Sequence, residues 1–586
     1  MSLFRQAGWW LGALLISVLG TSCAHTATKS GPLLKKAPAG DAYYGGFFHY
    51  NETEMFRNLF PLSITEVTSH RIGAQIYEGL VKFDQATLRV MPALAERWEV
   101  DSLGRLFTFH LRRGVWFHED ACFPNRTREV TAYDFKWCLD RLCTPHILNK
   151  GFWIFKDRVK GATAYYETIA GGGAPPSGGV PGIRVLDSFT LQIELEKPFA
   201  GFLNVLGTPF ASVYPREAFE TYGKRLRTHA VGTGPFLLDT IIEDQIAVLR
   251  RNPNYWAKDP YGNPLPYLDG ILVSFVSDQK MEFLQFTQGK LDMVYRTPME
   301  FHKYIFAGPD SLTREYRRFI LQATPQLATA YYGFLHVKPP FDDVRVRQAF
   351  NYAIDRDKLV RFTLKGEGYP AHHGFVPPAF ATYPSDSIRG YRYRPSLAQR
   401  LLAEAGYPQG KGFPELTLQL NSGGATNIPI AEAIQKMLED NLHIRVSLNI
   451  VPFAAHLEAV ETGKALFWRA GWIADYPDPE NFLNLFYSVH VPEKLEQHSY
   501  LNTFRYRSPR FDSLFEAALR TPDEHRRMRL YARADQQAVD DAVCLFLYYY
   551  KVHRLLQPYV RNFPINGMEF RDFTSVYFVP SAQSPS

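Results

Sequence analysis

Apolar and polar residues alternate in two stretches of the chain, and this pattern predicts half-buried β-strands. The stretches cover residues 191–195 and 444–450, in which leucine, isoleucine or valine occupies every second position. Because successive side chains of a strand point to opposite faces of a sheet, each stretch would place its apolar residues on one buried face.

Other stretches carry apolar residues at the three- and four-residue spacing of a helix with one buried face. They cover residues 130–142, 346–354 and 511–519. Asp342 or Asp343 can cap the second of these helices. After the third, Thr521-Pro522-Asp523-Glu524 matches a capping box with proline at the first helical position, which predicts a further helix. Strands and helices are mixed throughout, so the fold class is α/β or α+β.

The amino terminus has the pattern of an export signal. Arg5 provides a small positive charge, residues 9–20 form an apolar run, and small residues lead to Cys23. A membrane-spanning helix needs ~20 apolar residues, so residues 1–22 are predicted to be a cleaved signal peptide. The sequence before Cys23 resembles a bacterial lipobox, with Gly20 where the usual pattern has leucine. Acylated Cys23 would begin a lipidated tether, residues 23–41.

Size and composition indicate a large exported body behind that tether. At ~150 residues per domain, 586 residues suggest about three or four domains, and 46% hydrophobic residues suffice for sizeable cores. The net charge of +6 is spread along the chain, so no nucleic acid partner is predicted. The aromatic content of 15% favours large cores together with aromatic walls of a ligand cleft.

Four cysteines remain besides Cys23: Cys122, Cys138, Cys143 and Cys544. Export permits disulfides, and four cysteines allow three full pairings. Cys138 and Cys143 would lie roughly 8 Å apart in a helix, which disfavours that pair. Pairing of Cys122 with either of them and buried free thiols both stay open. No metal site is predicted, because no close cysteine pair is matched by a second pair or by spaced histidines.

Residues 468–482 read WRAGWIADYPDPENF and form a short, turn-rich segment. The proline steps disfavour helix, so the backbone is expected to be extended or turning. If Arg469 and Asp475 both face a cleft, they would hold the two charged ends of a zwitterionic ligand such as a short peptide. The alternative is structural: Trp472 belongs to a core, Asp478 opens a turn and Arg469 forms a surface ion pair.

Motifs of common enzymes are absent from the sequence. It contains no G-x-S-x-G elbow, no H-E-x-x-H and no Walker loop. Gly406 is interpreted as the glycine that ends a helix, and the run 171–179 as a flexible loop. Asp475 with Asp478 or Glu480 resembles a carboxylate pair for hydrolysis, but the neighbouring prolines favour an anchor and a turn.

Eight segments, taken in order, resemble a known bacterial family. They are IYEGL (76–80), FTFHLR (107–112), VTAYDF (130–135), GTGPF (232–236), RNPNYW (251–256), KPPFDDVRVRQA (338–349), LLAEAGY (401–407) and the segment 468–482. The chain resembles the extracellular solute-binding proteins, family 5, which include the oligopeptide- and dipeptide-binding proteins of ABC importers.

The resemblance implies an α/β, two-lobed periplasmic-binding-protein fold with a hinge and an extra subdomain on the first lobe. The first lobe would comprise residues 42–77, 216–327 and 552–586. The extra subdomain would be 78–215, and the second lobe 328–551. A few crossing segments would then absorb the rotation that closes the lobes on a ligand.

The resemblance also implies ligand-binding residues. Asp475 would pair with a peptide amino terminus and Trp472 would line a side-chain pocket. Arg469 would meet a peptide carboxylate, Tyr332 would line the cleft, and Gly471 belongs to the same motif.

The sequence departs from the family pattern in three ways, at four positions. A disulfide of some relatives falls at Ala328 and Ile473, a histidine that helps to hold longer peptides falls at Asn427, and an asparagine falls at Leu335.

The function that the resemblance implies is a lipid-anchored binding subunit of an ABC importer, without catalysis or cofactor. Its partners would be short peptides, the permease with its ATPase subunits, and a membrane. Three alternatives remain: a binder of another solute such as a nickel complex, haem or sugar, a peptide hydrolase, and a sensing surface lipoprotein.

Overall fold

The computed structural model describes residues 34–580 except Glu54, Arg296, Pro309, Ala381, 423–425 and Tyr500. The predicted signal peptide, Cys23 and the start of the predicted tether lie outside the described residues. The end of that tether contains strand β1 (Lys35–Lys36), which pairs with β2 (Tyr43–Tyr44). Ala37, which follows β1, packs with Ala42 and Tyr267, so the end of the predicted tether belongs to the folded body.

Three sheets form the framework of the described chain. A four-stranded sheet has the order β10 (Phe236–Ile242), β11 (Ile246–Arg251), β12 (Gly270–Phe275), β3 (Phe47–Glu52). A second has the order β6 (Ala95–Val100), β7 (Leu106–Leu111), β9 (Thr190–Glu194), β8 (Ile183–Asp187). The seven-stranded sheet has the order β13 (Met293–Tyr295), β21 (Cys544–Leu556), β16 (Ile320–Phe334), β20 (Phe467–Ile473), β18 (Leu416–Asn421), β19 (Val446–Val451), with β17 (Tyr369–Pro370) on β21.

Smaller two-stranded sheets join β4 (Val81–Phe83) to β5 (Val90–Pro92), β14 (Phe306–Gly308) to β15 (Ser311–Leu312), and β22 (Val560–Arg561) to β23 (Tyr577–Phe578). The helices of the first half are α1 (Val67–Gly73), α2 (Ala132–Leu142), α3 (Ala162–Ala170), α4 (Phe202–Leu206), α5 (Arg216–Tyr222), α6 (Gln279–Thr287) and α7 (His302–Ile305). Those of the second half are α8 (Val344–Ala353), α9 (Arg356–Lys358), α10 (Pro395–Glu404), α11 (Asn427–Leu442), α12 (Phe453–Glu461), α13 (Glu480–Leu483), α14 (Pro509–Leu519) and α15 (Glu524–Asp540). No described helix has the length and apolar character needed to cross a bilayer.

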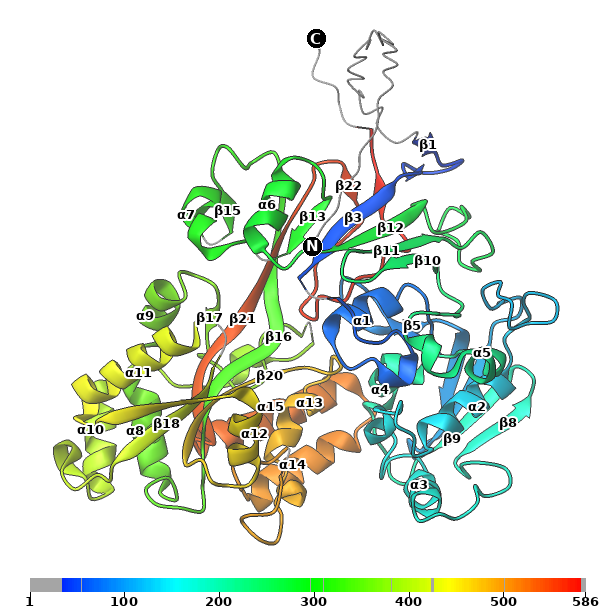
Figure 1. Cartoon of the computed structure of the whole chain (residues 1–586). Coiled ribbons are helices and arrows are strands. Elements are labelled where there is room, and N and C mark those ends of the chain that lie inside the picture. The colour runs from blue at the N-terminus through cyan, green and yellow to red at the C-terminus, as the bar shows by residue number, and fades with distance from the viewer. Residues whose placement is uncertain are drawn as a thin grey trace, which may run out of the picture. The chain divides into compact units, whose positions relative to one another are not determined.

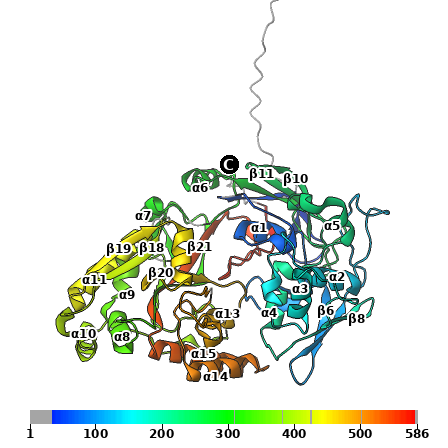
Figure 2. The same cartoon turned by 60° about the horizontal axis from the view of Figure 1, so that its bottom comes forward.

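Strand β16 is buried on both faces, and this burial organises the second half of the chain. Its residues Tyr332 and Phe334 join a hydrophobic cluster with α8, α10 and α11. Tyr331, on the opposite face, joins a cluster with α14 and α15. Because successive side chains of the strand point to opposite faces, α8, α10 and α11 pack on one side of β16, and α14 and α15 pack on the other (Figure 1). Figure 2 shows the same separation from another direction.

A separate cluster unites both four-stranded sheets with the end of the chain. Phe48 of β3 packs against the rings of Phe563, Phe573 and Phe578, at centroid distances of 5.5, 4.9 and 6.0 Å. Residues near the two ends of the sequence thus share one core. The last segment of the chain therefore returns to the sheet that contains β3.

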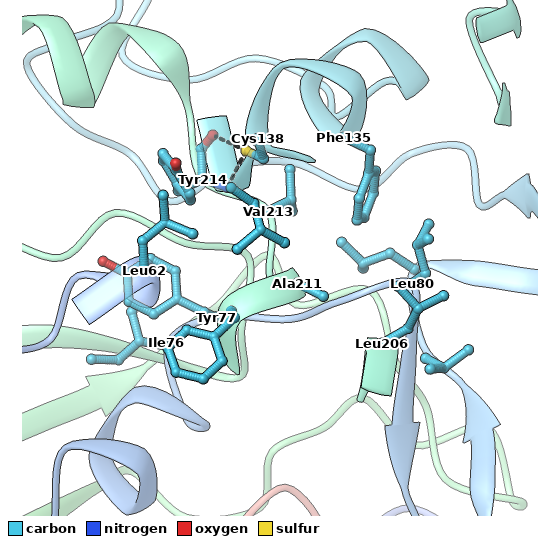
Figure 3. Close-up of a cluster of buried hydrophobic side chains, with 14 of the residues drawn as sticks. Leu62, Ile76, Tyr77, Leu80, Phe135, Cys138, Leu206, Ala211, Val213 and Tyr214 are labelled. Carbon is cyan, nitrogen blue, oxygen red and sulfur yellow. Dashed lines mark hydrogen bonds between the residues drawn. The ribbon is translucent and has the colours of Figure 1, made fainter. Parts of the chain in front are cut away.

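The four described cysteines are free thiols, which decides between the alternatives that the sequence leaves open. Cys138 lies on α2 among the apolar side chains of Figure 3, where its Sγ donates to the Tyr214 carbonyl at 3.2 Å. The Tyr214 N–H donates to the same sulfur at 3.4 Å. Burial raises the pKa of the Cys138 thiol well above its ordinary value, so it packs as an apolar side chain.

The periodic segments fold as predicted, apart from one cap. Helices α2, α8 and α14 and strands β9 and β19 cover the expected stretches, and Asp343 caps α8 by accepting from the Arg345 N–H at 2.8 Å. The capping box at Thr521 is wrong. Asp523 caps α15, and the Thr521 hydroxyl donates to the Ala517 carbonyl of the preceding helix instead.

Candidate functional site

A cavity of about 1240 Å³ opens among segments that are distant in sequence. Its lining comes from residues 51–71, 150–158, 197–199, 208–210, 279–295, 472–490, 501–519 and 568–569, with Gln326 between them. Typical small-molecule pockets measure roughly 300–1,000 Å³, so this cavity has room for a larger ligand together with water.

Trp472 and Asp475 lie on one wall of the cavity, and the buried amide of Asn481 fixes both. The Asn481 Oδ1 accepts from the Trp472 Nε1–H at 3.0 Å and from the Asp475 backbone N–H at 3.1 Å. Its Nδ2 donates to the Asp475 carboxylate at 3.3 Å. One side chain therefore sets the direction of an indole and of a carboxylate.

The Asp475 carboxylate is accessible to water in the cavity but surrounded by its walls. Desolvation by these walls raises the pKa of Asp475, and the hydrogen bond from Asn481 partly opposes that shift. Among the described residues, Asp475 takes part in no ion pair. A carboxylate in this position favours a positively charged group of a ligand.

The other predicted site residues lie on a different face. Tyr332 pairs with Arg469 in the β16–β20 ladder, so these two side chains share the face opposite Trp472. Arg469 donates to Asn421 Oδ1 at 3.2 Å and to the Tyr550 hydroxyl at 3.4 Å. Tyr332 is 1% exposed, and Gly471 lies beside Tyr550. None of the three is part of the cavity lining.

A network of buried charges forms another part of the cavity wall: Glu52, Arg71 and Glu569 line the cavity, and Arg571 joins them. Arg71 donates to Glu52 at 2.8 Å, and Arg571 donates to Glu52 at 2.7 Å and to Glu569 at 3.3 Å. Arg71 also stacks over Tyr295, with 5.0 Å from its guanidinium carbon to the ring centroid. The sequence reasoning missed these residues because they come from both ends of the chain and match no local motif.

Glu282 lines the cavity next to this network and is 3% exposed. Burial, followed by repulsion from Glu52, raises the pKa of Glu282 to about 8. Its carboxyl group is therefore mostly protonated at neutral pH and can donate a hydrogen bond.

Direct contacts join residues 158–204 to residues 478–519 at the cavity rim. Arg158 lies 3.7 Å from Glu480, the Asn204 amide donates to Asp478 at 3.0 Å, and the Ala200 N–H donates to the Leu519 carbonyl at 3.1 Å. Exposed Lys156 and Lys197 line the cavity on the same side as Arg158.

The cavity lining holds no group of three His, Cys, Asp or Glu side chains arranged for a metal ion. Such a group does occur in the described part of the chain, at His302, Glu367 and His553, and it lies outside the lining.

Comparisons with known proteins place this geometry in context. The profile described as bacterial extracellular solute-binding proteins, family 5 Middle, matches residues 89–491. Periplasmic oligopeptide-binding protein OppA of Salmonella typhimurium is 29% identical over 523 residues, 88% of this chain and 89% of the relative. Heme-binding protein A of Haemophilus influenzae is 30% identical over 492 residues, covering 81% and 82%.

Solved structures share the fold. MppA, a periplasmic murein tripeptide binding protein in an unliganded open form, has a TM-score of 0.75 at 23% identity, covering 95% of this chain and 100% of that chain. DppA from Helicobacter pylori in complex with the peptide STSA has a TM-score of 0.70 at 24% identity, covering 91% and 98%. The fold accordingly has two lobes.

The raised pKa of Glu282 makes stability depend on pH. The folded state keeps a proton on Glu282 up to about pH 8, whereas an unfolded glutamate releases it near 4.5. The free energy of unfolding therefore falls as pH rises from 4.5 to 8. Glu282→Gln should remove this loss and be more stable than the wild type at pH 9, on the order of a few kcal/mol, in urea unfolding.

Near pH 4.5 the two proteins should differ little. Glu415→Gln, at an exposed position, serves as the control and should follow the wild type at every pH. A Glu282→Gln profile parallel to that of the wild type between pH 5 and 9 would show that Glu282 is ionised in the folded state.

Proposed function

Because the chain belongs to the bacterial extracellular solute-binding proteins, family 5, we propose that it captures short peptides between its lobes and delivers them to an ABC permease. The curated relatives are named as binding proteins, and this chain is a binding protein rather than an enzyme.

One observation supports a peptide most strongly: Asp475 is a water-accessible carboxylate, without an ion pair among the described residues, beside Trp472 in a cavity of about 1240 Å³. A peptide amino terminus would supply the missing positive charge. Lys156 and Lys197 line the same cavity and would attract the terminal carboxylate or acidic side chains. Trp472 offers an apolar surface for a side chain.

Another solute is the second candidate, because the relatives include a haem-binding protein as well as dipeptide- and oligopeptide-binding proteins. Haem carries two carboxylates and no ammonium group. A site built around Asp475 therefore favours the peptide.

We also propose that the rim contacts belong to a closed state of the two lobes. Arg158 and Asn204 on one side meet Glu480 and Asp478 on the other, and Asp478 and Glu480 are nearly inaccessible to solvent. Ligand would shift the protein toward this state, since only there can both walls contact it.

Asp475→Asn should weaken binding of a peptide with a free amino terminus by roughly 2–5 kcal/mol, because the buried ammonium loses its counter-charge. The ligand is a peptide recovered from the purified protein by mass spectrometry and resynthesised, and calorimetry measures its affinity.

The same peptide with an acetylated amino terminus should bind the wild type as weakly as the free peptide binds the Asp475→Asn variant. Asp157→Asn changes another cavity carboxylate and should have a much smaller effect. Equal affinity of Asp475→Asn and wild type would remove Asp475 from the site.

The double variant Arg158→Met/Asn204→Ala should be more open than the wild type without ligand, because it loses both side-chain contacts at the rim and keeps only the backbone hydrogen bond from Ala200 to Leu519. Small-angle scattering should then give a larger radius of gyration. Arg184→Met is the control, since Arg184 pairs only with nearby Glu194 on the surface. Identical radii for the double variant and the wild type would show that these contacts do not hold the lobes together.

We further propose that acylated Cys23 anchors the protein to a membrane, where the permease resides. Cys23→Ser should move the protein from the membrane fraction to the soluble fraction. Durable attachment needs more than one acyl chain, and the variant lacks the thiol on which acylation begins. Cell fractionation with immunoblotting measures this shift. A wild type already found in the soluble fraction would contradict the anchor.

A further inference from the structure

Two imidazoles converge on one carboxylate far from the ligand cavity. His302 of α7 and His553 of β21 each place Nδ1 at 3.2 Å from an oxygen of Glu367. One ligand atom from each of the three residues lies within 4.8 Å of the others. In a tetrahedral zinc site, the ligand atoms lie 2.0–2.1 Å from the ion and about 3.3 Å from one another. Small movements of the three side chains would therefore let their ligand atoms bind one cation.

Thr297 holds the opposite edges of both rings. His302 Nε2 lies 3.1 Å from the Thr297 carbonyl oxygen, which can only accept, so this nitrogen carries the hydrogen. In the neutral ring, Nδ1 then presents a lone pair to the Glu367 carboxylate. Two acceptors at 3.2 Å repel each other unless a positively charged species lies between them.

His553 is oriented by the same threonine. Its Nε2 accepts from the Thr297 N–H at 3.5 Å and lies 3.1 Å from the Thr297 hydroxyl. Its Nδ1–H therefore points to Glu367 in the neutral ring. A metal ion at Nδ1 requires the other neutral tautomer, in which the hydrogen lies on Nε2 and is donated to the Thr297 hydroxyl in place of the 3.5 Å contact with the Thr297 N–H. A hydrogen-bonded residue behind the ligating histidines is typical of protein metal sites.

The surroundings allow a cation to enter. The side chains of His302 and Glu367 are 11% and 24% exposed, whereas that of His553 is 3% exposed. The ring of Phe306 packs against both imidazoles, at 5.2 and 5.1 Å between centroids. Lys551 on β21 and Lys365 are nearby positive charges, and Asp310 pairs with Lys551 at 2.7 Å.

We propose that His302, Glu367 and His553 form a binding site for a divalent transition-metal ion of the zinc type. Two imidazoles and a carboxylate are a donor set that zinc accepts, and three protein ligands leave a fourth position for water. The site would join parts of the chain that belong to different cores. Ile305 of α7 lies in one hydrophobic cluster and Leu364, near Glu367, in another. A bound ion would thus tie these cores together at strand β21.

The test uses the untagged protein, freed of metal by a chelator, with Zn²⁺ and Co²⁺ as probes. Competition with a chromophoric chelator should show one Zn²⁺ per chain, and Co²⁺ should give the visible absorption of a four-coordinate site. Glu367→Gln keeps the shape of the side chain and should weaken binding at least 100-fold. Thr297→Val should weaken it by about 10- to 100-fold. Zn²⁺ should raise the melting temperature of the wild type but not of Glu367→Gln.

His498→Gln is the matched control, because His498 also contacts two glutamates, Glu458 and Glu461, on the surface. It should bind Zn²⁺ as the wild type does. Circular dichroism checks folding, and His302→Gln replaces Glu367→Gln should the latter unfold. The proposal is overturned if the wild type binds no stoichiometric Zn²⁺, if the folded site variants bind as tightly as the wild type, or if His498→Gln loses binding equally.

Discussion

The pairing of β16 with β21 is the constraint on which the rest of the structure depends. The ladder runs in two parts, from Ile320 opposite Leu556 to Pro325 opposite Lys551, and from Thr329 opposite Tyr549 to Gly333 opposite Cys544. Between the two parts, the Leu327 N–H donates to the Gly567 carbonyl at 2.8 Å. The backbone polar groups are thus satisfied where the ladder is interrupted, as burial requires. This interruption lies beside Gln326, which lines the cavity.

The two walls of the cavity treat charge differently. In one wall, Arg71 and Arg571 share Glu52 and Glu569, so the buried charges compensate each other within the protein. On the other wall, the Asp475 carboxylate accepts a hydrogen bond from the Asn481 amide and forms no ion pair with a described residue. Removing a charge from water without a partner is costly, and a ligand that supplies the partner recovers that cost. Under the proposed function, the wall with compensated charges would contact the ligand through its shape, and the wall with Asp475 would contact it through charge.

Local patterns predicted the local structure well. The alternation at 191–195 and the three-to-four spacing at 511–519 identify β9 and α14, because a buried face imposes its period on the sequence. The motif around Trp472 and Asp475 also pointed to residues that line the cavity. The same motif does not show that Arg469 lies on the opposite strand face from Trp472, which depends on the register with Tyr332. The Arg71–Glu52–Arg571 network could not be predicted from local sequence patterns, because Glu52 and Arg571 are 519 positions apart in the sequence.

The pair Ala328 and Ile473 has a consequence for how the protein matures. These residues are direct partners in the β16–β20 ladder, and the family resemblance of the sequence implies a disulfide of some relatives at these two positions. Here the ladder and the hydrogen bond from the Ala474 N–H to the Leu327 carbonyl, at 2.9 Å, hold the segment that precedes Asp475. No covalent cross-link fixes this segment, and the four described cysteines are free thiols. The described part of the chain can therefore reach its native state without an oxidant or a disulfide isomerase, and the cavity wall around Asp475 does not depend on the redox state of its surroundings.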